Sequence, residues 1–222
     1  MTRLLYDLAA ADESVRFSPY CWRTKLALAH KNLTYTTVPW HFTDKQAIAF
    51  SGSDKVPVLV DGIKTVADSQ AIAEYLDETY PNEPPLFGEP PTRALTNFIR
   101  AWTDRVLHVT LASILVPDIF PRLAECDKDY FRTTREAWLG CTIEELATRR
   151  PAAIAAFQAV LAPLLTTLKT QKFIAGDAPA YADHIIFGAL QWARLMSSTP
   201  LFDTTSPLTT WMTAVLDTYG LA

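Results

Sequence analysis

Residues 56–80, VPVLVDGIKTVADSQAIAEYLDETY, decide how the first part of this chain folds. They begin with an apolar, β-branched run that carries a proline, and Asp61-Gly62 favours a tight turn into the β-prone run 64–67. Asp68-Ser69 can then cap a helix, in which apolar residues recur at helical spacing until Pro81. The stretch therefore predicts a β-hairpin followed directly by a helix.

The residues before this stretch predict a strand, a helix and a second strand. Residues 3–8 (RLLYDL) form a short β-prone run, and Ser18-Pro19 is a helix-start signal. We expect this helix to run to about Lys31, with Asn32 as a left-handed cap at its end. Residues 34–38 (TYTTV) are β-branched and predict the second strand, parallel to the first.

A proline-rich stretch, residues 81–91 (PNEPPLFGEPP), separates this α/β part from the rest of the chain. The later residues show helix-compatible spacing and no convincing strand. We expect helices at 92–115, 129–148, 151–170, 181–197 and 207–219. The fold class is therefore α/β plus all-α, with an α/β domain over 1–82, a linker over 83–91 and an all-helical domain over 92–222.

Composition excludes several classes of function. The chain has 20 basic and 24 acidic side chains and a net charge of −4, so we expect no nucleic-acid or membrane partner. Its three cysteines have no metal-ligand spacing, which argues against a disulfide framework and against a metal site. Asp7 interrupts the first apolar run, so we expect no secretion signal and a cytoplasmic protein.

The last third of the chain is poor in charge. Residues 151–168 carry no charged side chain, but Pro151 and Pro163 interrupt the run and its alanine-rich composition is only weakly hydrophobic. We therefore reject a membrane span. We expect 151–168 to be a central helix of the helical domain, covered on most sides, and 181–197 to be a core helix.

Three local motifs can carry chemistry, and each also has a plain structural explanation. Ser18 lies at a helix N-terminus, where free amides favour negative charge and would push a bound thiol toward thiolate, although Ser18 can equally be only a cap. Val56-Pro57 indicates a sheet edge, a bulge or a cis peptide, and Val56 can pair with an extended peptide ligand. Asp68-Ser69 suits the amino-acid head of a ligand, or simply caps its helix.

The order of these motifs resembles the cytosolic glutathione transferase superfamily over essentially the whole chain. It is similar to the etherase-like branch of fungal transferases and bacterial β-aryl etherases. The matching segments are 5–8 (LYDL), 18–25 (SPYCWRTK), 66–69 (VADS), 72–77 (IAEYLD) and 173–177 (FIAGD) with Asp183. The family usually has Ser or Thr three residues before that aspartate, and Ala180 here leaves the capping box incomplete.

The resemblance implies a thioredoxin-like domain followed by a helical domain, glutathione as co-substrate, and a homodimer active in detoxification. It implies that Ser18 activates the glutathione thiol. Val56 and Pro57 would bind the cysteinyl backbone, and Asp68 and Ser69 the γ-glutamyl group. Either His41 or Lys45 would hold the glycyl carboxylate, and the choice stays open.

The second substrate would be a hydrophobic, electrophilic aromatic molecule, and β-aryl ether cleavage is one such reaction. Its pocket would lie between the domains near Trp102 and Arg105, although Trp102 is as easily explained by packing. Two other functions stay open: a ligandin that carries aromatics with little turnover, and a thiol-disulfide reductase that uses Cys21. Ser18-x-x-Cys21 looks like a dithiol motif in which the first cysteine, the nucleophile in thioredoxin-like proteins, has been replaced. This disfavours the reductase, and Cys21 is better explained as a small packed hydrophobe.

Overall fold

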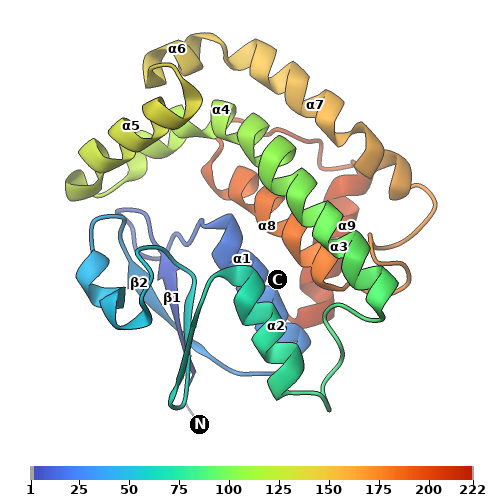
Figure 1. Ribbon diagram of the computed structural model, residues 1–222. Coiled ribbons are helices and arrows are strands. Elements are labelled where there is room, and N and C mark those ends of the chain that lie inside the picture. Colours follow the sequence, from blue (N-terminus) through green and yellow to red (C-terminus); the bar gives the residue numbers. More distant parts are fainter. Residues whose placement is uncertain (1–2, 222) are drawn as a thin grey trace.

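The computed structural model describes residues 3–221, which form a small sheet domain and a larger helical part (Figure 1). The sheet has the order β2-β1-β3-β4. Its strands are β1 (Arg3–Leu8), β2 (Thr36–Trp40), β3 (Val58–Asp61) and β4 (Lys64–Ala67). β1 pairs parallel to β2 and antiparallel to β3, and β3 pairs antiparallel to β4. The helices of this domain are α1 (Pro19–His30), the 3-10 helix η1 (Lys45–Ser51) and α2 (Ser69–Thr79).

This order is the expected thioredoxin-like arrangement, with two shifts in strand position. β2 begins at Thr36 and ends at Trp40, two residues later than predicted, and Pro39 lies inside it. Proline is tolerated there because β2 is an edge strand, where a missing N–H costs little. β3 begins at Val58 rather than Val56, because Pro57 has no N–H to donate to the ladder.

The helical part contains the segments that the spacing predicts, divided differently. The helices are α3 (Pro90–Trp102), the π-helical turn η2 (Thr103–Leu107), α4 (His108–Ile119), the 3-10 turn η3 (Phe120–Arg122), α5 (Glu125–Leu139), α6 (Ile143–Thr148), α7 (Arg150–Thr167), α8 (Tyr181–Met196) and α9 (Pro207–Tyr219). α4 continues through Pro117, whereas the expected helix 129–148 is divided at Gly140, whose φ of 69° is a left-handed helix end. α3 begins at Pro90, inside the stretch expected to be the linker.

The prediction of a central helix at 151–168 was wrong. α7 lies along the outside of the molecule (Figure 1), and only Phe157, Leu161 and Leu164 are buried on it. The alanine-rich segment of α7 that follows Arg150 can face solvent without charged side chains, because each methyl group exposes little apolar surface. Within residues 3–221, no helix is both long and apolar enough to span a bilayer.

The central helix is α8, as the spacing of 181–197 predicted. Asp183 at its start is buried and accepts hydrogen bonds from the backbone amides of Ile174 (2.7 Å), Ala175 (3.1 Å) and Ala180 (3.1 Å) and from the indole of Trp211 (2.9 Å). Only the aspartate half of a capping box is formed, since Ala180 has no side-chain acceptor. This carboxylate joins the loop before α8 to α9.

α8 also joins the two parts of the molecule. A Cβ atom placed on Gly188 would lie 2.3 Å from the carbonyl oxygen of Pro19, the first residue of α1. Only glycine permits this approach of α8 to α1, because any side chain would overlap the backbone. The start of α1 is therefore positioned directly by the helical part.

Candidate functional site

A cavity of about 680 Å³ lies between the sheet domain and the helical part. Its volume is within the usual range for small-molecule sites. The sheet-domain wall includes Ser18, Tyr20, Lys45, Val56, Pro57 and Asp68. The helical wall includes Asp104, His108, Tyr130, Arg135, Trp138 and Trp192. Four of the residues predicted to bind glutathione, and the serine predicted to be catalytic, thus line one cavity.

Ser18 is the N-cap of α1, and its sequence context explains this position. Its backbone is extended, and Pro19 occupies the first turn of the helix, where a missing N–H costs nothing. The Cys21 N–H donates to Ser18 Oγ at 3.2 Å, and the residue is 4% exposed. Ser18 also lines the cavity, so its hydroxyl can donate its proton to a group bound there.

The Val56–Pro57 peptide bond is cis, one of the three alternatives that the sequence left open. The Pro57 carbonyl accepts from the backbone N–H of Asp68 at 3.2 Å, which brings the start of α2 beside this bond. Asp68 has a φ of 79° and caps α2 by accepting from the N–H groups of Gln70 (2.9 Å) and Ala71 (3.1 Å). Asp68 also lines the cavity, so the residue that caps α2 is at the cavity wall.

Ser69 is buried and is not among the residues that line the cavity. It begins α2 directly behind Asp68, and its carbonyl accepts from the Tyr181 hydroxyl at 2.8 Å. The structure therefore places Ser69 beside the cavity wall rather than in it.

The two candidates for the glycyl carboxylate are separated by the fold. The ammonium group of Lys45 lies 5.0 Å from the ring centre of Trp40 and 4.8 Å from that of Tyr130, and Lys45 lines the cavity. His41 does not line the cavity, and its Nδ1 lies 3.6 Å from the buried carboxylate of Asp127. Placement thus favours Lys45.

The second-substrate residues expected at Trp102 and Arg105 do not line the cavity. Trp102 packs against the core and Arg105 is exposed, whereas Asp104 and His108, from the same turn of chain, face the cavity. The π-helical turn η2 widens the helix here, which changes the face that each residue occupies. A sequence pattern with α-helical spacing could not have predicted that change.

A polar cluster beside Ser18 connects the two walls. The guanidinium of Arg23 forms an ion pair with Asp104 at 2.6 Å, and the Tyr20 hydroxyl lies 3.3 Å from Nδ1 of His108. Burial, followed by the charge of Arg23, holds the pKa of His108 well below its usual range, so its ring is neutral at pH 7. Burial and the nearby carboxylate of Asp104 raise the pKa of Tyr20. Tyr20 therefore keeps its proton and can donate it to a ligand oxygen.

Cys21 is fully buried and does not line the cavity. Its thiol donates to the Tyr6 carbonyl at 3.9 Å, and burial together with the charge of Asp7 raises the pKa well above its usual value. A reactive cysteine needs the opposite, an accessible thiolate. This burial argues against the reductase that uses Cys21. Among residues 3–221, no cluster of three or more histidine, cysteine or acidic side chains could hold a metal ion.

The α5 part of the cavity wall was missed by the sequence prediction. Phe131, Arg135 and Trp138 line the cavity and follow one another at a spacing of four and three residues, which places them on one face of α5. Such a face could have been found from its spacing. What the spacing could not show is that this face turns toward the sheet domain rather than toward the other helices.

A thioredoxin-like domain joined to a helical domain, with a capping serine facing the cavity between them, defines the class of thioredoxin-fold transferases. Residues 14–85 match the family model of the glutathione S-transferase N-terminal domain, and residues 94–211 match that of the C-terminal domain. The second match alone spans more than half of the chain. This chain belongs to the glutathione S-transferase family.

Similar proteins come from plants and fungi. A probable glutathione S-transferase of Glycine max is 29% identical over 132 residues, covering 55% of this chain and 59% of that protein. The probable glutathione S-transferase GSTU6 of Oryza sativa subsp. japonica is 27% identical over 188 residues, covering 79% of this chain and 68% of that protein. The chain thus spans less than two thirds of the first of these relatives.

Solved structures match over almost the full length. The crystal structure of glutathione transferase GSTFuA3 from Phanerochaete chrysosporium is 25% identical, with a TM-score of 0.87 over 99% of this chain and 97% of that one. The glutathione S-transferase CsGST63524 of Ceriporiopsis subvermispora, solved in complex with glutathione, is 26% identical, with a TM-score of 0.82 over 98% and 96%. These fungal neighbours agree with the resemblance to the etherase-like branch.

Proposed function

We propose that this glutathione S-transferase binds glutathione in the cavity and uses Ser18 to stabilise the glutathione thiolate. The observation that carries the proposal is the position of Ser18, whose hydroxyl caps α1 and which lines the cavity. A free thiol has a pKa of about 8.5, and each unit by which it is lowered corresponds to about 1.4 kcal/mol. One hydroxyl donor and the positive end of α1 together are suited to lowering the pKa of the bound thiol.

The rest of the sheet-domain wall matches the groups that glutathione presents. We assign the cysteinyl backbone to Val56 beside Pro57, because an extended peptide can pair there as an added strand would. We assign the γ-glutamyl group to Asp68, which lines the cavity, and to Ser69 at the first turn of α2. We assign the glycyl carboxylate to Lys45, because this cation lies in the wall and His41 does not.

The second substrate in this proposal is a hydrophobic, electrophilic aromatic molecule. Support comes from the helical wall, which presents the rings of Tyr130, Trp138 and Trp192 to the cavity. In the reaction a carbon–sulfur bond forms and the bond to the leaving group breaks, with the electron pair going to that group. When the leaving group is an aryl ether oxygen, the Tyr20 hydroxyl in the cavity wall can stabilise the departing aryloxide by donating a hydrogen bond to it, and the aryloxide then takes its proton from solvent.

The proposal is tested by retention on immobilised glutathione and by turnover of a panel of halogenated nitroaromatics and β-aryl ethers. Binding of hydrophobic aromatics is measured in parallel by displacement of a fluorescent probe. We expect retention and glutathione-dependent turnover, with turnover decreased by Ser18→Ala. Aromatic binding without turnover would instead support a ligandin, and absence of retention would contradict glutathione dependence.

We also propose that the protein acts as a homodimer in the cytoplasm. Three large apolar side chains, Phe50 of η1 and Leu95 and Phe98 of α3, are more than half exposed and are suited to contact with a second copy of the chain. Analytical ultracentrifugation tests this. A wild-type dimer that Phe98→Glu converts to a monomer is the expected result, and a wild-type monomer at micromolar concentration would contradict it.

A further inference from the structure

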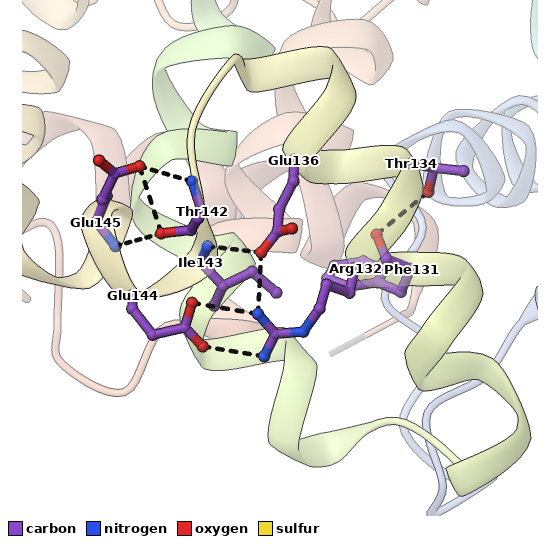
Figure 2. A network of polar contacts seen from close by, with 8 residues as sticks. All are labelled: Phe131, Arg132, Thr134, Glu136, Thr142, Ile143, Glu144 and Glu145. Atoms are coloured by element: carbon purple, nitrogen blue, oxygen red, sulfur yellow. Dashed lines mark hydrogen bonds and ion pairs between the residues drawn. The ribbon is translucent and has the colours of Figure 1, made fainter.

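Two arginines three residues apart on α5 have opposite surroundings. Arg132 lies on the outer face and is fully matched by carboxylates (Figure 2): its guanidinium contacts Glu136 at 2.9 Å and Glu144 at 3.0 Å. Arg135 faces the cavity, and within residues 3–221 no carboxylate lies within 4.0 Å of its guanidinium. One arginine therefore has a structural ion pair, and the other has its charge available.

The surroundings of Arg135 are aromatic rather than acidic. Its guanidinium lies 5.3 Å from the ring centre of Phe42 and 4.9 Å from that of Phe131, and it donates one hydrogen bond, to the adjacent Thr134 hydroxyl at 2.9 Å. Burial among these rings lowers the pKa of Arg135, yet a guanidinium stays charged at neutral pH. The rings hold the planar cation in place, and among residues 3–221 most of its five N–H donors have no hydrogen-bond partner.

The acids in the cavity wall are already used by other groups. Among the described residues, the wall contains two carboxylates, those of Asp68 and Asp104. Asp68 accepts two backbone N–H groups of α2, and Asp104 is paired with Arg23 at 2.6 Å. Neither is available to neutralise Arg135, so the cavity presents an uncompensated positive charge on its helical wall.

We propose that Arg135 binds a carboxylate carried by the aromatic second substrate, an inference that rests on the function proposed above. A planar guanidinium fixed between rings presents parallel donors that match the two oxygens of a carboxylate. Trp138 lies one helical turn further along the same face of α5, so an aromatic ring bearing that carboxylate can pack against the indole. The substrate class is an electrophilic aromatic acid rather than a neutral aromatic.

Glutathione also has carboxylates, and the arrangement of cations assigns them elsewhere. Lys45 and Lys55 line the cavity from the sheet domain, which holds Ser18 and the Val56–Pro57 bond. Arg135 comes from α5 in the helical part and faces the aromatic wall. A change at Arg135 should therefore alter the affinity for the second substrate and leave the affinity for glutathione unchanged.

A matched pair of electrophiles tests the inference: 4-(chloromethyl)benzoate and its uncharged methyl ester. In both, sulfur displaces chloride from the same benzylic carbon. The two differ only in the para substituent, and the uncatalysed rate of each with glutathione corrects for its effect on the reactivity of that carbon. We expect the wild type to favour the acid in kcat/KM. Arg135→Gln should decrease kcat/KM for the acid about tenfold, mainly through KM, and change that for the ester less than twofold. Arg135→Lys should restore part of the preference for the acid.

The control variant is Arg132→Gln, which removes the same charge from the same helix outside the cavity and should leave both kcat/KM values unchanged. A readout independent of turnover is the binding of unreactive 4-methylbenzoate and methyl 4-methylbenzoate, followed by tryptophan fluorescence. Equal affinity of the wild type for the acid and the ester would overturn the inference. Turnover of the ester without any preference for the acid would overturn the inference alone, whereas no retention on glutathione would overturn the proposed function.

A weakened affinity of Arg135→Gln for glutathione itself would assign Arg135 to a glutathione carboxylate and would equally overturn the inference. Isothermal titration of glutathione into the wild type and the variant measures this directly. Thermal unfolding of each variant shows whether α5 keeps its position.

Discussion

The two walls of the cavity are built in different ways. The sheet-domain wall depends on backbone conformation: a capped helix start at Ser18, a cis bond at Val56–Pro57 and a positive φ at Asp68. The helical wall depends on side chains such as His108, Arg135 and Trp192, which come from three different helices, α4, α5 and α8. The first wall recognises the peptide co-substrate in our proposal, and the second recognises the variable partner.

Because of this difference, we expect the sheet-domain wall to tolerate little change. The sheet-domain wall is formed by backbone elements whose caps and turns also stabilise the fold, so a change in its geometry also affects the core. A side-chain wall can change one residue at a time while its helices stay in place. We expect variants of the first wall to affect all substrates, and variants of the second to affect particular ones.

The largest effect is expected where the helical part touches the sheet-domain wall. In Gly188→Ala the new Cβ would meet the Pro19 carbonyl at 2.3 Å, and either α1 or α8 must move. We expect a loss of about 3 kcal/mol in the free energy of unfolding, measured with urea, and a decreased kcat/KM for every substrate. Gln158→Ala on the exposed side of α7 is the control and should change stability by less than about 0.5 kcal/mol. An unchanged urea midpoint in Gly188→Ala would show that the contact between Gly188 and the Pro19 carbonyl does not position α1.

Ser18→Ala changes the sheet-domain wall alone. Removing the one hydroxyl donor should decrease kcat about a hundredfold, which is typical of the loss of a donor to a developing anion. The pKa of the bound thiol should rise, because the thiolate loses its stabilisation, and the rise of activity with pH should shift to higher pH. Ser14→Ala, in the exposed loop before α1, should leave the profile unchanged. A full-activity Ser18→Ala enzyme with the same pH profile would contradict the assignment.

The sequence predicted most of the sheet-domain wall because its signals are local. A serine before a proline predicts a helix start, and Asp68 before an apolar helical pattern predicts another, without knowledge of the rest of the fold. The cis bond was only one of three alternatives, since a proline beside a strand permits several geometries. The placement of Lys45 in the wall, and of His41 outside it, needed the tertiary structure.

The helical wall was poorly predicted for a physical reason. Helical spacing identifies a face of a helix but does not say which neighbour that face meets, so Arg135 and His108 were not identified. In the segment that contains the π-helical turn η2, Asp104 and His108 line the cavity, whereas Trp102 and Arg105 do not. The uncharged segment 151–168 was misassigned for a related reason: absence of charge indicates low polarity, not burial.

A smaller effect, on stability, is expected from pH at a buried contact behind both walls. His184 of α8 is fully buried, and its Nε2 lies 2.8 Å from the Tyr219 hydroxyl, which also lies 2.8 Å from Nδ1 of His30. Burial, followed by the charge of His30, holds the pKa of His184 well below 6.5. Below pH 6.5 the unfolded chain therefore binds a proton at His184 that the folded chain does not bind. The contribution of His184 to the free energy of unfolding is thus complete above pH 6.5 and is lost as pH falls.

The expected slope for this histidine is about 1.4 kcal/mol per pH unit below its unfolded pKa. Urea unfolding of the wild type and of His184→Gln between pH 7 and pH 5 measures it. His184→Gln should be less stable at pH 7 and should have a shallower pH dependence. Parallel curves of unfolding free energy against pH for the two proteins would show that His184 does not contribute to the pH dependence. That dependence would then be assigned to His30 and His108.

The smallest effect distinguishes the two candidates for the glycyl carboxylate. Lys45→Met keeps an apolar chain against Trp40 and Tyr130 and removes the charge together with the hydrogen bond that the ammonium donates to the Asp54 carbonyl at 2.6 Å. The KM for glutathione should rise about fivefold while kcat stays nearly constant. Added salt should raise the wild-type KM and have less effect on the variant, because the lost interaction is electrostatic. His41→Gln should change the KM less than twofold, since His41 lies outside the cavity. A larger rise in the KM for glutathione in His41→Gln than in Lys45→Met would assign the glycyl carboxylate to His41. The glutathione site would then extend toward Asp127, the residue that His41 approaches.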